Sequence, residues 1–233
     1  MNSISVDLNG KVVAVTGASG ALGSAVVRTL RDCNAVVAQI DHAPVSAGNA
    51  EPLRFGGYDL ADSEAAAGAL AQVAAKAGKI DALINIAGGF QFQKLEAGSL
   101  EHWDNMYRQN LRSAVACCAA ALPFLVNSGA GRIINLGAAG AEHAGAGMGA
   151  YAAAKAGVAK LTESLAQELK DRGVTVNAIL PSIMDTPRNR LDMPDADFTR
   201  WVPLESVAKL MAYLLSDAAA AITGALIPIK GRV

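Results

Sequence analysis

The sequence predicts an α/β protein with a three-layer, doubly wound architecture around a seven-stranded parallel sheet. Short runs rich in valine and isoleucine alternate with longer, alanine-rich stretches of helical periodicity, and a glycine-rich turn follows the first run. Strands that alternate with helices pair in parallel, because each helix carries the chain back across the sheet. Residues 1–233 contain no internal repeat and no dividing linker, so we expect a single domain.

The composition argues against several classes of function. Twenty basic and 21 acidic residues give a net charge of −1 without a basic stripe, so nucleic acid is not an expected partner. Residues 1–7 lack the charged-then-apolar layout of a signal peptide. The longest apolar run, 114–126, is too short to span a bilayer and contains Pro123. We therefore expect a cytoplasmic protein that does not enter the membrane.

The three cysteines are Cys33, Cys117 and Cys118. Their number is odd and adjacent cysteines rarely pair with each other, so we expect reduced thiols in the core. No histidine clusters near them, and the sequence therefore predicts no metal site.

The apolar pattern and the turn residues set the expected elements. Strands are expected at 11–16, 35–41, 80–86, 131–136, 175–180 and 225–229, with a short strand inside the loop 44–57. Helices are expected from the glycine turn to about Cys33, from Asp62 or Ser63 to Lys79 with Gly78 as the stop, and at 99–127, 150–173 and 204–216. Pro123 should bend or shorten the end of its helix. Residues 185–203, with three prolines and many charges, are expected to form a mobile substrate lid with a short helix.

The turn Gly17-Ala-Ser-Gly20-Ala-Leu-Gly23 lies between the first strand and the first helix. Glycines there let backbone N–H groups approach a pyrophosphate, and the positive end of the helix dipole favours the same anion. The pattern predicts a dinucleotide site; the alternative is a tight structural turn.

Asp41 ends the second expected strand, 24 residues after Gly17. An acid at this place can accept hydrogen bonds from the adenosine ribose and would repel a 2′-phosphate. The next residues, His42, Ala43 and Pro44, supply no lysine or arginine. The sequence therefore favours NAD(H) over NADP(H), with a solvated loop acid as the alternative.

Tyr151 and Lys155 are four residues apart in a helix of small residues, so their side chains share one face. An ammonium group beside a phenol favours the phenolate by charge. The tyrosine could then pass a proton near neutral pH. The alternative is an ordinary pair of surface residues.

Together these residues resemble the short-chain dehydrogenase/reductase family, and the resemblance covers essentially the whole chain. The matching features are Thr16-Gly17 with Gly23, Asp41, Asp59, Asn85-x-Ala87-Gly88, Asn110, Tyr151-x-x-x-Lys155 and Pro181-x-x-x-x-Thr186. The resemblance implies a Rossmann fold in which Tyr151 is the general acid/base, Lys155 lowers its pKa and binds the nicotinamide ribose, and Asn110 holds a proton-relay water. It implies cofactor contacts from Gly17, Ser19, Gly20, Ala21, Leu22, Gly23, Asp41, Asp59, Leu60, Asn85, Ala87, Gly88, Tyr151, Lys155, Pro181, Ile183 and Thr186.

Four positions depart from the family pattern. Ala21 stands where T-G-x-x-x-G-x-G has a glycine, Ile86 replaces an asparagine and Ser182 replaces a glycine; we expect little effect from these. Ala138, thirteen residues before Tyr151, replaces the catalytic serine. That serine stabilises a developing alkoxide, so plain ketone reduction should be slow unless another donor acts. Nearby candidates are Glu142, His143 and Asn135.

The departure at Ala138 resembles one branch of the family, dihydropteridine reductase, which keeps the tyrosine and lysine but lacks this serine. That branch reduces quinonoid dihydropterin with NADH. Residues 180–201 resemble the same segment of that branch, whereas Asn110 resembles the wider family. Three functions stay open: reduction of a quinonoid or conjugated acceptor, an ordinary alcohol/ketone pair, and NAD-responsive binding without catalysis. Ala138, His143, Met184 and Trp201 are the expected substrate contacts.

The long helices at 100–127 and 150–172 are rich in alanine and apolar side chains. The resemblance implies that they pack against copies of themselves in a homodimer or homotetramer. The alternative is that these faces belong to the internal core.

Overall fold

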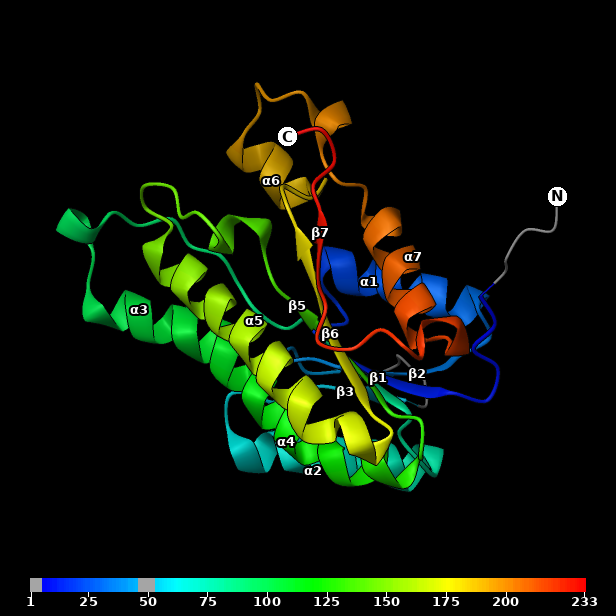
Figure 1. The fold of residues 1–233 in the computed structure, drawn as a ribbon. Helices are drawn as coiled ribbons and strands as arrows, with labels where there is room; N and C mark the ends of the chain where they lie inside the picture. The colour runs from blue at the N-terminus through cyan, green and yellow to red at the C-terminus, as the bar shows by residue number, and fades with distance from the viewer. Residues whose placement is uncertain (1–5, 46–52) are drawn as a thin grey trace, which may run out of the picture.

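The computed structural model describes residues 6–45 and 53–233, and it confirms the predicted seven-stranded parallel sheet (Figure 1). The strand order is β3-β2-β1-β4-β5-β6-β7. The strands are β1 (Val12–Thr16), β2 (Val36–Ile40), β3 (Arg54–Phe55), β4 (Ala82–Asn85), β5 (Arg132–Leu136), β6 (Thr175–Pro181) and β7 (Leu226–Ile229). The chain builds outward from β1 to β3 and then returns to pair β4 with the other side of β1. Such a reversal opens a crevice at the carboxyl ends of the strands, where ligands of this fold class bind.

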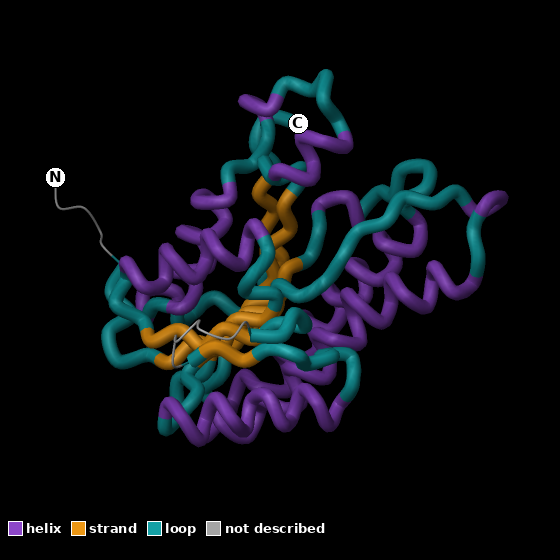
Figure 2. Tube along the Cα trace, turned by 180° about the vertical axis from the view of Figure 1, so that it is seen from behind, coloured by secondary structure: helices purple, strands orange, loops and turns teal. Residues whose placement is uncertain are grey.

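Helices cover both faces of the sheet, which gives the expected three layers (Figure 2). One face carries α1 (Ala21–Asp32) and α7 (Leu204–Leu215). The other face carries α2 (Ser63–Ala77), α4 (Ser113–Asn127) and α5 (Gly149–Leu169). The helix α3 (Leu100–Tyr107) packs against α5, and the short α6 (Pro187–Asp192) lies in the expected lid segment. The 3₁₀ turns are Leu95–Ala97, Ala139–Ala141, Lys170–Arg172, Phe198–Arg200 and Asp217–Ala219.

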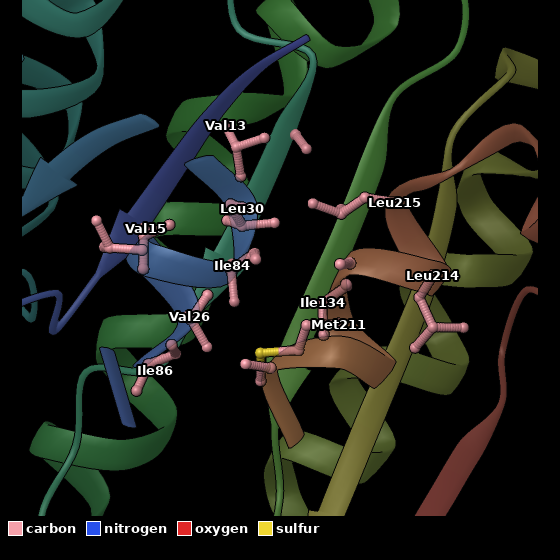
Figure 3. Close-up of a cluster of buried hydrophobic side chains, with 14 of the residues drawn as sticks. Val13, Val15, Val26, Leu30, Ile84, Ile86, Ile134, Met211, Leu214 and Leu215 are labelled. Atoms are coloured by element: carbon pink, nitrogen blue, oxygen red, sulfur yellow. The ribbon is translucent and has the colours of Figure 1, made fainter. Parts of the chain in front are cut away.

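Alternating side chains of the strands feed two separate cores, because successive residues of a strand point to opposite faces. Val13 and Val15 of β1 pack with α1 and α7, as Figure 3 shows for this cluster. Val12 and Ala14 pack on the opposite face with α2, α4 and α5. Burial on both sides explains why the strands read as continuous apolar runs rather than alternating ones.

The predicted helix limits are mostly confirmed. The Asp62 carboxylate caps α2 by accepting hydrogen bonds from the N–H groups of Glu64 and Ala65. Gly78 ends that helix with a φ of 83°, and Gly173 follows the end of the α5 segment with a φ of 71°. Both are left-handed conformations that favour glycine.

The expected helix at 99–127 differs from prediction in two ways. Its middle, Arg108–Arg112, is a π-helical turn that joins α3 to α4. The helix also continues to Asn127 past Pro123, so the proline does not shorten it. A π turn inside an α-helix inserts one residue, and such insertions are frequent at functional sites.

The helical run Leu100–Asn127 is the one stretch of the described residues that is long and apolar enough to cross a membrane. This is weak evidence, because buried helices of globular folds pass the same test. Cys117, Cys118, Ala121 and Leu125 of this run lie in the core cluster beneath α2 and the sheet. Packing within the fold therefore accounts for the buried part of this run.

Candidate active site

A cavity of about 920 Å³ opens at the carboxyl ends of the central strands. It extends from the glycine turn and Asp41 to Tyr151 and the lid segment. The sequence-predicted residues that line it are Gly17, Gly20, Ala21, Leu22, Gly23, Asp41, Asp59, Leu60, Ala87, Gly88, Asn110, Tyr151, Lys155, Met184 and Thr186. The fold therefore brings most of the predicted site together from segments far apart in the chain.

Two glycines of the turn have no room for a side chain. Gly17 has a φ of 65°, and a Cβ there would lie 2.8 Å from the backbone nitrogen of Ala87. A Cβ on Gly23 would lie 2.1 Å from the carbonyl oxygen of Gly17. Because Gly17 has no side chain, the turn can approach the end of β4. Because Gly23 has none, α1 can begin directly against the turn.

The N-terminus of α1 faces this cavity without a side-chain cap. Gly20 is the N-cap residue, and no acidic side chain lies in the first turn of the helix. Gly20, Ala21, Leu22 and Gly23 all line the cavity. Unpaired N–H groups and the positive end of the helix dipole suit the diphosphate of a dinucleotide, so this part of the site fits such a cofactor.

The Asp41 carboxylate is held by backbone groups at the end of β2. One oxygen accepts a hydrogen bond from the N–H of Ser19 at 2.9 Å, and the other accepts from the N–H of Ala43 at 3.3 Å. Ser19 itself lies outside the lining of the main cavity, and its contribution is this backbone contact. The bond ties the glycine turn to Asp41 and fixes the carboxylate at the cavity wall.

The hydroxyl of Thr16 joins the first and fourth strands at the floor of the site. It accepts hydrogen bonds from the N–H groups of Ile86 at 3.1 Å and Ala87 at 3.2 Å. Because these contacts use the backbone of Ile86, replacing the family asparagine at this position leaves them intact. The expectation that Ile86 has little effect agrees with this geometry.

Asn110 lies in the π turn with its side chain buried. Its amide nitrogen donates to the carbonyl oxygens of Gly89 at 2.9 Å and Met106 at 3.0 Å, and its oxygen accepts from the N–H of Gly89 at 3.3 Å. The side chain therefore clamps the turn after β4 against the helix. This explains an asparagine in mid-helix, while the proton-relay water stays a prediction.

Tyr151 and Lys155 lie one turn apart on α5, and both line the cavity. The Lys155 ammonium donates to the carbonyl oxygen of Leu136 at 2.7 Å and lies 5.9 Å from the centre of the Tyr151 ring. Burial raises the pKa of the Tyr151 phenol to about 12 and lowers the pKa of Lys155 to about 8. Loss of solvation disfavours both charged forms, so burial decides the direction of both shifts, and the role of Lys155 in lowering the tyrosine pKa stays a prediction.

Asn85 lies beneath the cavity and is not part of its lining. Its side-chain nitrogen donates to Asn135 at 2.9 Å, and Asn135 in turn donates to the Thr162 hydroxyl at 3.0 Å. This buried chain links β4, β5 and α5. It also uses the amide of Asn135, a candidate donor in place of the missing serine.

One of the four predicted substrate residues, Met184, lines the cavity. Ala138 is buried, with 6% of its surface exposed. Trp201 is also buried, against the ring of Phe198 at 4.7 Å, and His143 is exposed on the loop before α5. Ala138, Trp201 and His143 are not in the cavity lining, nor are the predicted cofactor residues Pro181 and Ile183.

Several residues of the cavity wall were missed by the sequence reasoning. The Phe90 ring meets the Tyr151 ring edge to face, with centres 5.1 Å apart, and is half exposed. Arg108 of the π turn contacts Asp59 on the opposite wall. The glycines before Phe90 were a usable signal, whereas nothing in the local sequence marks Arg108. Among residues 6–45 and 53–233, no group of three His, Cys, Asp or Glu side chains could hold a metal ion.

Comparisons with known proteins agree with this geometry. The family model described as short chain dehydrogenase matches residues 11–196. The 3-oxoacyl-[acyl-carrier-protein] reductase FabG of Pseudomonas aeruginosa is 34% identical, over 97% of this chain and 98% of the relative. The D-beta-hydroxybutyrate dehydrogenase of Rhizobium meliloti is 31% identical, over 95% of this chain and 97% of the relative.

A solved structure shares the fold: the 3-ketoacyl-(acyl-carrier-protein) reductase of Brucella melitensis complexed with NADH. Its TM-score is 0.85 at 25% identity, with 97% of this chain and 98% of that chain covered. The uncapped helix α1, the Asp41 wall and the Tyr151–Lys155 pair agree with this relationship. The chain belongs to the short-chain dehydrogenase family and is an NAD(P)H-dependent oxidoreductase of that family.

Proposed function

We propose that this chain is an NAD(H)-dependent reductase of a small conjugated or quinonoid acceptor, with an ordinary carbonyl compound as the second candidate. The observation that carries the proposal is the pair Tyr151 and Lys155 in the cavity lining, without a serine thirteen residues before the tyrosine. The residue at that position, Ala138, is buried and offers no hydroxyl to a substrate oxygen. The favoured acceptor is therefore one whose reduction requires a proton but no hydrogen-bond donor to stabilise an alkoxide.

The nicotinamide cofactor supplies hydride when bound. Gly17, the N-terminus of α1 and Asp41 would hold its diphosphate and adenosine end, and Lys155 and Thr186 would face its nicotinamide end. Tyr151 would give its phenolic proton to the reduced substrate. Because burial raises the pKa of Tyr151 to about 12, the phenol is protonated at neutral pH, which is the form that a reduction needs. Phe90 and Met184 would exclude water from the same end of the cavity.

Preference for NAD(H) over NADP(H) rests on Asp41. Both of its oxygens accept backbone hydrogen bonds, so the carboxylate is fixed where a ribose would bind. A 2′-phosphate beside it would meet a like charge. Of the cationic groups near this wall, Arg108 is paired with Asp59, while Arg54 lines an adjoining pocket together with Asp41.

The second candidate, an alcohol/ketone pair, is favoured by the relatives. Those named above are a 3-oxoacyl reductase and a hydroxybutyrate dehydrogenase, and dihydropteridine reductase is not among them. A ketone would develop an alkoxide next to Ala138, where the family serine would stand. The missing hydroxyl is why we rank this reaction second.

The test is oxidation of NADH and of NADPH by a panel containing quinonoid dihydropterin, small quinones and 3-oxoacyl esters. The matched variant is Tyr151→Phe, which keeps the ring against Phe90 and removes only the hydroxyl. Rapid turnover of the conjugated acceptors with NADH, lost in Tyr151→Phe, is the expected result. Turnover confined to 3-oxoacyl esters would replace the first candidate by the second. Equal rates with NADPH would refute the role given to Asp41.

We also propose a homodimer or homotetramer formed through the long helices. Trp103, Tyr107 and Val115 are exposed apolar residues on the run Leu100–Asn127, as expected for a face that another copy covers. Light scattering that gives the mass of one chain would refute it.

A cytoplasmic location remains a prediction. The three cysteines are unpaired, as is usual for proteins of a reducing compartment.

A further inference from the structure

The π turn Arg108–Arg112 makes contacts to two separate walls of the cavity. Asn110 clamps Gly89 after β4, as described above. On the other side, a guanidinium nitrogen of Arg108 donates to the Asp59 carboxylate at 2.5 Å, and Arg112 donates to the carbonyl oxygen of Ala61 at 2.8 Å. One short segment therefore braces both turns that border the cavity.

Asp59 is held from two directions. Its second carboxylate oxygen accepts from the N–H of Ala61 at 3.0 Å, while the first accepts from Arg108. The hydrogen bond from Arg108 is the main cause that lowers the pKa of Asp59. Both side chains are about half exposed and both line the cavity, so the pair borders the space rather than the core.

The charge of this pair bears on an anionic ligand. Asp41 and Asp59 line the same end of the cavity, and a dinucleotide diphosphate would bring further negative charge to it. Two carboxylates facing an anion oppose its binding unless a cation offsets them. Arg108 is the cation in direct contact with Asp59, at the point where the adenosine would lie.

We propose that Arg108 is a positioning residue for the cofactor, which fixes the Asp59 carboxylate at the adenosine end of the cavity and offsets its charge. This inference rests on the proposed NAD(H) function of the cavity. Arg108 acts through Asp59 and touches none of the groups around Tyr151. Its loss should therefore weaken cofactor binding and leave the proton transfer unchanged.

The experiment is a fluorescence titration with NADH, which requires no turnover. Arg108→Gln should raise the Kd for NADH about three- to fivefold, the scale of an exposed ion pair. Arg108→Lys should recover most of the affinity, since the present contact uses a single guanidinium nitrogen. Salt of about 0.5 M should reduce the difference between the variants. The melting temperature and kcat at saturating NADH should stay at their wild-type values.

Two further variants isolate the mechanism. In an Asp59→Asn background, Arg108→Gln should change the Kd by less than about 1.5-fold, because the charge that it offsets is gone. Lys160→Gln breaks a similar exposed pair with Glu163 on α5, outside the cavity lining, and should leave the Kd unchanged. An unchanged Kd in Arg108→Gln, or a loss that persists in full without the Asp59 charge, would overturn the inference. Failure of the wild-type protein to bind NADH would overturn the proposed function itself, which is a different result.

Discussion

Gly23 offers a sharp test of the glycine turn. The change is Gly23→Ala, which adds one methyl group at the start of α1. That methyl would lie 2.1 Å from the carbonyl oxygen of Gly17 and 2.7 Å from the Cα of Ala18. Ordinary contact begins near 3.4 Å, and both neighbours are backbone atoms, so α1 and the turn must separate by about 1.3 Å.

The expected cost follows from two opposing effects. Forcing a methyl into a filled site costs about 1–3 kcal/mol, while alanine is favoured over glycine in a helix by about 1 kcal/mol. The net loss of unfolding free energy is therefore about 0–2 kcal/mol. For a chain of this size, that lowers the melting temperature by up to about 8 °C. The displaced N-terminus of α1 should also weaken NADH binding at least about tenfold, because its N–H groups no longer meet the diphosphate.

Thermal unfolding and NADH titration measure both effects, and Gly68→Ala is the matched control. Gly68 is exposed in the middle of α2, and a Cβ there meets nothing within 4 Å. Its replacement should raise the unfolding free energy by about 0.5–1 kcal/mol without changing NADH affinity. If Gly23→Ala were as stable as Gly68→Ala and bound NADH normally, the close packing of the turn would not matter and the reasoning would fail.

Three further predictions concern side chains whose environment the fold defines. Ala138→Ser should raise kcat/KM for a simple ketone about tenfold or more, since one oxyanion donor contributes on that scale; no gain would show that another donor acts or that ketones do not fit. Because the pKa of Lys155 is about 8 when folded and 10.5 when unfolded, the unfolded state binds more protons between these values. The unfolding free energy of wild type relative to Lys155→Met should therefore rise by about 2 kcal/mol from about pH 7.5 to 9.5 in denaturant titrations. The comparison with Lys155→Met is needed because the raised pKa values of Cys117 and Cys118 lower the unfolding free energy of both proteins over the same range. Burial raises the pKa of both Cys117 and Cys118 to about 12, so iodoacetamide at about pH 8 should label the partly exposed Cys33 first; early labelling of the buried pair, seen by mass spectrometry, would contradict their burial.

The sequence by itself determined the sheet, the order of elements and the core of the site. Val12–Thr16 and the turn after it are local features, because a buried strand needs apolar side chains on both faces and a tight turn needs glycine. Tyr151 and Lys155 share a helix face by spacing alone. Local periodicity was sufficient for these features.

Only the tertiary structure decided how the site residues act. Arg108 meets Asp59 across 49 positions of sequence, and the π turn that presents it has no local signature. Asn85 and Trp201 prove to be packed away from the cavity. Burial raises the pKa of Tyr151, an effect that its spacing to Lys155 does not predict. In each case the outcome depends on solvation and on contacts between distant segments, and these quantities exist only once the chain has folded.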